Sequence, residues 1–149
     1  MIKTITVDRG LLVDLIKKTT DGHIKYKLGA KCKIDADSSE IKAIDCSGFV
    51  RWLIYRISGF DIDDGSWIQR RYLDTMGFTY CNYADCAKLD DKLRIAFINP
   101  EDGKAGHVWL VVNGMTIESY GHNGPGRRPW NTRTLKSKVD YCFVLTGDM

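Results

Sequence analysis

The segment AIDCSGFVRWLIYRISG (residues 43–59) contains a helical pattern that begins at a cysteine. From Cys46 onward, apolar residues recur at intervals of three and four, the spacing that places them on one side of a helix. These residues are Cys46, Phe49, Val50, Leu53, Ile54 and Ile57. We therefore expect a helix from about Cys46 to Ile57 whose apolar side, thiol included, faces the core.

The thiol of Cys46 has two interpretations. Free cysteine is among the residues most often buried, so Cys46 could simply fill space in the core. Its place in the first helical turn, however, lets unpaired backbone N–H groups and the positive end of the helix dipole stabilise a thiolate nucleophile. Asp45 can cap this helix, and Ser47 and Gly48 leave room for a substrate to approach. A nucleophile of this kind also needs a base.

Two segments typical of strands, HVWLVV (107–112) and MTIESY (115–120), are joined by Asn113 and Gly114. An Asn-Gly pair predicts a two-residue hairpin turn, which fixes the pairing of the two strands. One side of the hairpin then carries an almost wholly apolar set, namely Val108, Leu110, Val112, Met115, Ile117 and Ser119. The other side carries His107, Trp109, Val111, Thr116, Glu118 and Tyr120.

Among the three histidines, His107 is the best candidate for the base. Glu118 lies diagonally opposite on the same side of the hairpin, at a Cβ separation of about 7 Å that its side chain can span. Nucleophile, base and orienting carboxylate together are the arrangement of cysteine hydrolases. Considered alone, His107 could be a partly buried histidine whose hydrogen bonds are satisfied, and Glu118 could be a solvent-facing strand residue. His122 is the alternative third residue, and His23 lies in a polar stretch that predicts an exposed loop.

Two further helices are expected. Asp8 can cap a first helix that continues to Thr19, where a polar, glycine-containing stretch follows. A third helix is expected from about Ser66 to Met76, capped near Asp64 or by Ser66 itself.

The remaining strands are expected in LRIAFIN (93–99) and DYCFVLTG (140–147), which are rich in branched and aromatic residues. Because the helices come first and the antiparallel strands follow, the predicted fold class is α+β. We find no repeat, low-complexity tract or linker, so a single domain is expected over residues 1–149.

The formal net charge of +3 is too small to indicate nucleic-acid binding, but basic residues gather in one stretch near the C-terminus. They are Arg127, Arg128, Arg133, Lys136 and Lys138. This stretch could meet an anionic substrate or could be a solvated loop. The apolar run from Leu11 to Ile16 is interrupted by Asp14, so we expect it to form neither a signal-peptide core nor a membrane span.

The five cysteines contain no C-x-x-C motif. The closest pair, Cys81 and Cys86, lacks a second pair of ligands at zinc-finger spacing, so neither a zinc site nor a cofactor is expected. Apart from Cys46, four cysteines remain, and they could form two disulfides in any of three pairings or stay reduced. The sequence leaves this choice open.

Three segments resemble the NlpC/P60 family of papain-like cysteine peptidases. DCSGFV (45–50) resembles the nucleophile motif of that family, GHVWLVV (106–112) its histidine strand, and YKLGA (26–30) the short segment that precedes the nucleophile. The resemblance implies a papain-like fold, with N-terminal helices packed on an antiparallel sheet of about five to six strands. It also implies that Tyr26 lies beside Cys46.

In that family the third catalytic residue is often a histidine, whereas Glu118 is similar to the glutamate of the related CHAP amidases. The resemblance implies catalysis by Cys46, His107 and Glu118. It further implies that Tyr26, together with Asp45, Ser47 and Trp109, contacts the substrate or the oxyanion.

The resemblance implies a hydrolase of bacterial peptidoglycan that cuts stem peptides between D-Glu and the diamino acid. An amidase that cuts between sugar and peptide would use the same three residues, and a transferase would use the same thioester. A phage tail or wall-binding module that has lost catalysis is the non-enzymatic alternative.

A cell-wall enzyme made in the cytoplasm without a signal peptide would act at the wall or in the periplasm only after lysis or dedicated delivery. Both a phage lysin and an injected antibacterial effector fit this expectation. The producer of an effector would also need an immunity protein that inhibits the enzyme. The expected partners are therefore a peptidoglycan peptide and, for an effector, such an inhibitor, but not nucleic acid.

Overall fold

The computed structural model describes residues 3–101, 103–121, 123–130, 132, 135 and 137–149. Its helices are α1 (Arg9–Thr19), the 3-10 helix η1 (Ser38–Glu40), α2 (Cys46–Ser58), α3 (Ser66–Thr75) and α4 (Tyr83–Cys86). Its strands are β1 (Thr79–Cys81), β2 (Arg94–Ile98), β3 (His107–Val112), β4 (Met115–Tyr120), β5 (Gly124–Gly126) and β6 (Tyr141–Val144). None of the helices in these residues combines the length and apolar character needed to cross a bilayer.

The strands form one six-stranded antiparallel sheet in the order β1-β6-β2-β3-β4-β5. The hairpin register predicted for β3 and β4 is confirmed, since Val112 pairs with Met115 and Leu110 pairs with Ile117. Asn113 has the positive φ of 53° that this turn requires. The α+β class and the expected number of strands are therefore confirmed.

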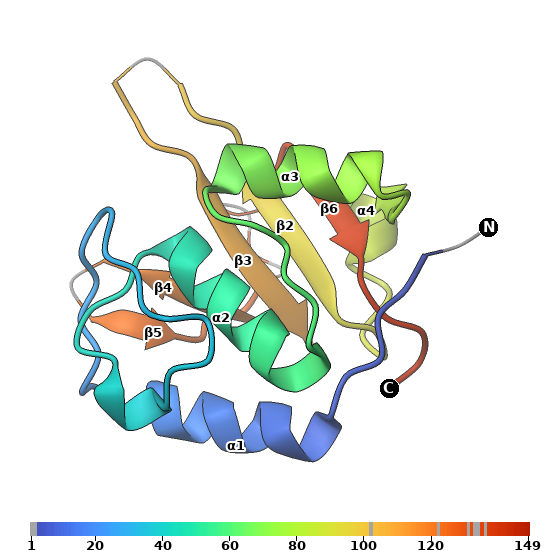
Figure 1. Ribbon diagram of the computed structural model, residues 1–149. Helices are drawn as coiled ribbons and strands as arrows, with labels where there is room; N and C mark the ends of the chain where they lie inside the picture. The colour runs from blue at the N-terminus through green and yellow to red at the C-terminus, as the bar shows by residue number, and fades with distance from the viewer. Residues whose placement is uncertain (1–2, 102, 122, 131, 133–134, 136) are drawn as a thin grey trace.

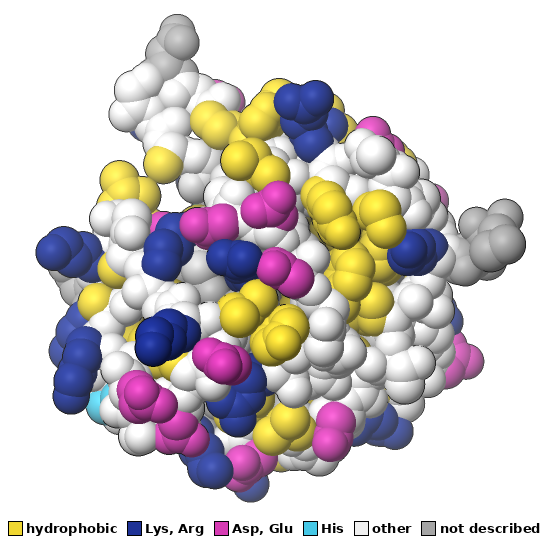
Figure 2. Space-filling view, in the orientation of Figure 1, with side chains coloured by type: hydrophobic (Ala, Val, Ile, Leu, Met, Phe, Trp, Pro, Cys, Tyr) yellow, Lys and Arg dark blue, Asp and Glu magenta, His cyan; other side chains and the backbone are white. Residues whose placement is uncertain are grey.

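Helix α2 lies across β3 and β4 (Figure 1), and its apolar side is buried as the sequence predicts. Val108, Leu110 and Val112 belong to the same buried cluster as α2, whereas Trp109 and Val111 belong to a second cluster. The alternation expected along β3 is thus present, and each side of the strand packs in its own core. Basic and acidic side chains are interspersed on the face that carries α1, α2 and α3 (Figure 2), in keeping with the small net charge of +3.

Some local expectations were wrong. The residue that caps α3 is Gly65, with a φ of 86° and no side-chain hydrogen bond, rather than Asp64 or Ser66. The sequence did not indicate β1, β5 or α4. Cys81 and Cys86 form a disulfide, which settles part of the question that the sequence left open, while Cys32, Cys46 and Cys142 are free.

Candidate active site

Cys46 is the first residue of α2, and Asp45 is the N-cap residue. The Asp45 carboxylate accepts a hydrogen bond of 2.8 Å from the backbone N–H of Gly48. This cap fixes where the helix starts, because it satisfies one of the N–H groups that lack a partner within the helix. The other N–H groups of the first turn surround the thiol with positive electrostatic potential.

His107 is the first residue of β3, and its side chain is 19% exposed. Its Nε2 atom lies 2.7 Å from Oε1 of Glu118, so the predicted contact across the hairpin is present. Helix α2 packs against the side of β3 that carries Val108, whereas the His107 side chain belongs to the other side. However, Cys46 and His107 are each the first residue of their element. This placement allows the thiol and the imidazole to interact beyond the edge of the strand.

The electrostatics of His107 reflect both of its neighbours. Burial disfavours the charged imidazole, but hydrogen bonds with Cys46 and Glu118 outweigh this effect, so the pKa of His107 rises from 6.5 to about 9. A raised pKa keeps the ring protonated at neutral pH. At 6% exposure Cys46 is nearly buried, as the core interpretation expects. A thiol that only fills space, however, needs no ionisable partner.

Glu118 is fully buried and is held by a second cation that the sequence did not reveal. Arg128 donates from Nε to Oε2 at 2.8 Å and from Nη2 to Oε1 at 3.0 Å, a bidentate pair. Burial opposes ionisation, but the hydrogen bonds from His107 and Arg128 are the largest opposing effects, and the pKa of Glu118 is lowered. The carboxylate therefore stays charged and fixes the orientation of the imidazole. A buried glutamate near a basic segment is the signal that could have suggested this pair.

Lys31 organises the other side of the helix start. Its Nζ atom lies 2.8 Å from carboxylate oxygens of Asp45 and of Asp64, and it donates to the hydroxyl of Ser47 at 2.8 Å. Burial works against this charge, but the hydrogen bonds with the two aspartates outweigh it and raise the pKa of Lys31. This network could not be predicted from sequence, because its members come from three separate segments.

Three of the residues expected to contact the substrate are buried. Asp45 and Ser47 are 5% and 4% exposed, and both side chains are engaged in the Lys31 network. Contact of these two side chains with a substrate stays a prediction. Trp109 is fully buried, and its ring centroid lies 6.5 Å from that of Trp130. Its ring centroid also lies 5.3 Å from that of His107.

Tyr26 lies close enough to Cys46 and Asp45 to interact with them electrostatically. Its pKa is raised, first by burial and then by the nearby charges of Cys46 and Asp45. Tyr26 and His107 line the same cavity of about 320 Å³. The other residues that line it are Ile98, Tyr120, Gly121, Arg128, Leu135 and Lys138. The cavity is thus a surface recess with cationic side chains next to the imidazole.

The basic segment divides between structural and cavity positions. Arg127 donates to the backbone carbonyls of Thr116 and Val112, and therefore ties the segment to the hairpin. Arg128 and Lys138 line the cavity, whereas Arg133 and Lys136 lie outside the described residues.

The two remaining histidines do not add to the site. His23 is exposed, as predicted, and its ring contacts Asp21 and the carbonyl of Ser38. His122, the alternative orienting residue, lies outside the described residues.

Two solved structures that match this chain are NlpC/P60 proteins. One, from Staphylococcus aureus, is described as similar to a lipoprotein of the NLP/P60 family; it matches with a TM-score of 0.63 and 13% identity over 97% of this chain and 44% of its own. The other, an NlpC/P60 family protein from Bacillus cereus, matches with a TM-score of 0.50 and 21% identity over 68% of this chain and 31% of its own. This chain therefore spans less than half the length of either protein.

No protein-family model matches the sequence, and no curated protein matches it. At identities of 13% and 21%, the two structural likenesses show the fold alone. The chain has the α+β, papain-like fold found in the NlpC/P60 proteins, with helices packed on a six-stranded antiparallel sheet.

Proposed function

We propose that this protein is a cysteine endopeptidase that hydrolyses amide bonds in the stem peptides of bacterial peptidoglycan, with residues 1–149 as one catalytic domain. The observation that carries the proposal is the short contact of 2.7 Å between His107 and a buried, charged Glu118, next to a cysteine at a helix start. The NlpC/P60 fold of the structural neighbours supports the choice of substrate class.

In the proposed reaction, the Cys46 thiolate attacks the carbonyl carbon of the scissile amide. The Nε2 atom of His107 is bound to Glu118, which leaves Nδ1 for the thiol side. Since the pKa of His107 is raised to about 9, the ring carries the proton at neutral pH and can pass it to the leaving amine. Water then hydrolyses the thioester and regenerates the thiol.

The oxyanion of the tetrahedral intermediate needs hydrogen-bond donors. The backbone N–H of Cys46 lies in the first turn of α2, where N–H groups have no acceptor within the helix. The hydroxyl of Tyr26 is the second donor that we propose, because this side chain lies in the cavity beside His107. Each such donor is commonly worth about 3 kcal/mol of transition-state stabilisation.

We propose the bond between D-Glu and the diamino acid as the site of cleavage. Stem peptides carry carboxylates, and the cations that line the cavity, Arg128 and Lys138, would attract them. The enzyme would act at the cell wall or in the periplasm, as a phage lysin or as a delivered effector. An effector would be matched by an inhibitor protein in the cell that makes it.

Digestion of purified peptidoglycan, followed by mass analysis of the fragments, tests this function. The expected products are two stem-peptide fragments per cleaved D-Glu linkage whose masses together exceed that of the parent peptide by one water. Free peptides with intact sugars would indicate an amidase, and products that carry an added amine or alcohol would indicate a transferase.

Replacement of Cys46 tests whether it is the nucleophile. We expect Cys46→Ala to reduce cleavage by roughly 10⁴-fold or more. Cys32→Ala, which removes another free cysteine, should leave cleavage unchanged. Full activity in Cys46→Ala, or no cleavage by the folded wild-type protein, would refute the proposal.

A further inference from the structure

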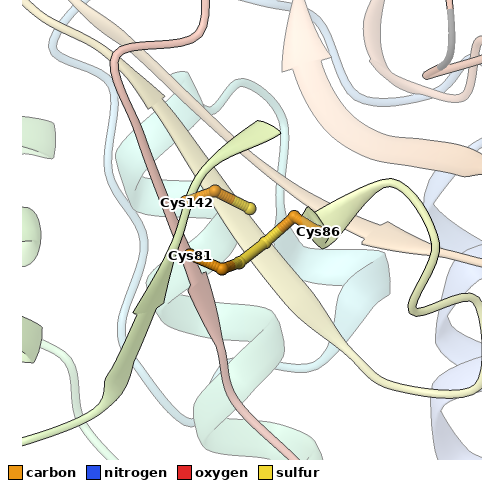
Figure 3. Close-up of side chains that lie close together, drawn as sticks. All are labelled: Cys81, Cys86 and Cys142. Carbon is orange, nitrogen blue, oxygen red and sulfur yellow. A yellow bond between two sulfur atoms is a disulfide. The ribbon is translucent and has the colours of Figure 1, made fainter. Parts of the chain in front are cut away.

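Three cysteines that the proposed reaction does not use meet where β1, β6 and α4 come together. Cys81 ends β1, Cys142 lies opposite it on β6, and Cys86 ends α4. Their sulfur atoms all lie within 4.8 Å of one another. The Cys142 side chain points toward the bonded pair of Cys81 and Cys86 (Figure 3). The cluster therefore has a third thiol beside a disulfide.

We propose that, once the disulfide is reduced, Cys81, Cys86 and Cys142 together bind one Zn²⁺ ion. The spacing of Cys81 and Cys86 is C-x4-C, within the range that zinc sites use for a ligand pair. The sequence offers no second pair, but the pairing of β1 with β6 brings Cys142 beside the first. Thiolates are ligands that favour zinc over hard cations such as Mg²⁺ and Ca²⁺.

The geometry suits a tetrahedral ion. With zinc–sulfur bonds of about 2.3 Å, the sulfurs of a tetrahedral site lie about 3.8 Å apart. The three sulfur atoms lie within 4.8 Å of one another, so small side-chain rotations can bring them to this spacing. Cys81 is half-buried while the other two cysteines are buried, so a water molecule can reach the fourth position from the side of Cys81.

A buried cation offsets the charge of such a site. Three thiolates around Zn²⁺ carry a net charge of −1. Arg94 is fully buried, and its Nη1 donates to the carbonyl of Cys86 at 2.6 Å. Its Nη2 has no hydrogen-bond partner among the described residues, and the exposed carboxylate of Asp90 lies 3.6 Å from it. Because few groups neutralise the charge of this buried guanidinium, Arg94 would stabilise an anionic zinc site.

Zinc binding requires two reactions, namely reduction of the disulfide and deprotonation of the three thiols. A trialkylphosphine and one water convert the disulfide into two thiols, and the phosphine becomes its oxide. Binding of Zn²⁺ then breaks three S–H bonds, forms three Zn–S bonds and releases three protons to the buffer. Because the disulfide engages two of the three ligands, the oxidised protein should not bind the ion.

The test uses the full chain carrying Cys46→Ala, so that the thiol of the proposed active site takes no part. Metal-free protein is reduced with a trialkylphosphine under nitrogen and titrated with Co²⁺, which reports thiolate ligands by charge-transfer absorption, and then with Zn²⁺. We expect one Co²⁺ per chain, its displacement by Zn²⁺, and a melting temperature that rises by several degrees with Zn²⁺.

Variants separate this site from other thiols. Cys142→Ser leaves the disulfide pair intact and should weaken binding at least about tenfold, whereas Cys32→Ser should not change it. If Cys142→Ser does not fold, as judged by circular dichroism, Cys81→Ser at the sheet edge replaces it. Absence of binding by the reduced protein, equal binding by the oxidised protein, or equal binding by the folded ligand variant would overturn the proposal. The outcome does not depend on whether the protein cleaves peptidoglycan.

Discussion

The hydroxyl of Ser119 donates a hydrogen bond of 2.8 Å to the backbone carbonyl of Ile44, a residue 75 positions away in the chain. Ser119 follows Glu118 on β4, and Ile44 precedes the N-cap of α2. Both groups are buried, so the bond joins the strand of the orienting carboxylate to the segment that presents the thiol. The position of Cys46 relative to His107 thus depends partly on a contact outside the proposed catalytic residues.

Ser119→Ala should lower both stability and activity. It leaves the Ile44 carbonyl buried without this partner, which costs about 1 kcal/mol, or roughly 2–4 °C in melting temperature. Thermal unfolding measures this loss, and kcat/KM for a muropeptide measures the effect on the site. Ser39→Ala, at an exposed position, is the control and should change neither. An unchanged melting temperature in Ser119→Ala would show that the contact contributes nothing.

The pH dependence of activity should report the proton on His107. Since the pKa of His107 is about 9, we expect kcat/KM to fall as the pH rises through about 9 and the ring loses the proton for the leaving amine. In Glu118→Gln the neutral amide stabilises the protonated imidazole less than a carboxylate does. The pKa of His107 should therefore fall, and activity should be lost at a lower pH than in the wild type. The rate should also fall, by about 10²- to 10⁴-fold. A profile that does not shift in Glu118→Gln would argue against the orienting role.

Arg128→Met should destabilise the protein in a pH-dependent way. The pKa of Glu118 is lowered in the folded protein, despite burial, by its hydrogen bonds to His107 and Arg128. Its charged contacts therefore stabilise the fold at pH values above the unfolded pKa, near 4.5, and this contribution is lost as the pH falls through the folded pKa. We expect a loss of about 1–3 kcal/mol at pH 7 that shrinks under acidic conditions.

Urea unfolding of Arg128→Met at several pH values measures this difference. Lys17→Met, which removes an exposed charge on α1, is the control and should be close to neutral throughout. A constant difference between Arg128→Met and wild type from pH 7 to pH 3 would mean that the arginine does not act through the charge of Glu118.

Features set by local sequence could be predicted. The Asn113-Gly114 turn and strict alternation fix the register of β3 and β4, and with it the contact between His107 and Glu118. The position of Asp45 likewise predicts that it caps α2, as it does. The catalytic roles of these residues remain predictions.

Features that depend on distant segments could not be predicted in the same way. β5 consists of Gly-Pro-Gly, which has no strand propensity and is a strand only through its pairing with β4. The bidentate contact of Arg128 with Glu118 follows from that return of the chain. Alternation predicts the side of β3 on which Trp109 lies, but not that Trp130 packs against that side and that Trp109 is buried there. Sequence alternation gives the side of a strand, not what covers it.

Lys31 joins Asp45 to Asp64 at the start of α2. In Lys31→Met the buried Asp45 carboxylate loses its cation, so we expect a loss of about 1–3 kcal/mol and a weaker cap beside Cys46. The reaction rate of Cys46 with iodoacetamide, followed against pH, tests whether the cap positions the thiol. Lys31→Arg should restore most of the stability, and Lys33→Met at an exposed neighbouring position should have no effect. If Lys31→Met leaves the alkylation profile unchanged while stability falls, the network supports the fold without tuning the nucleophile.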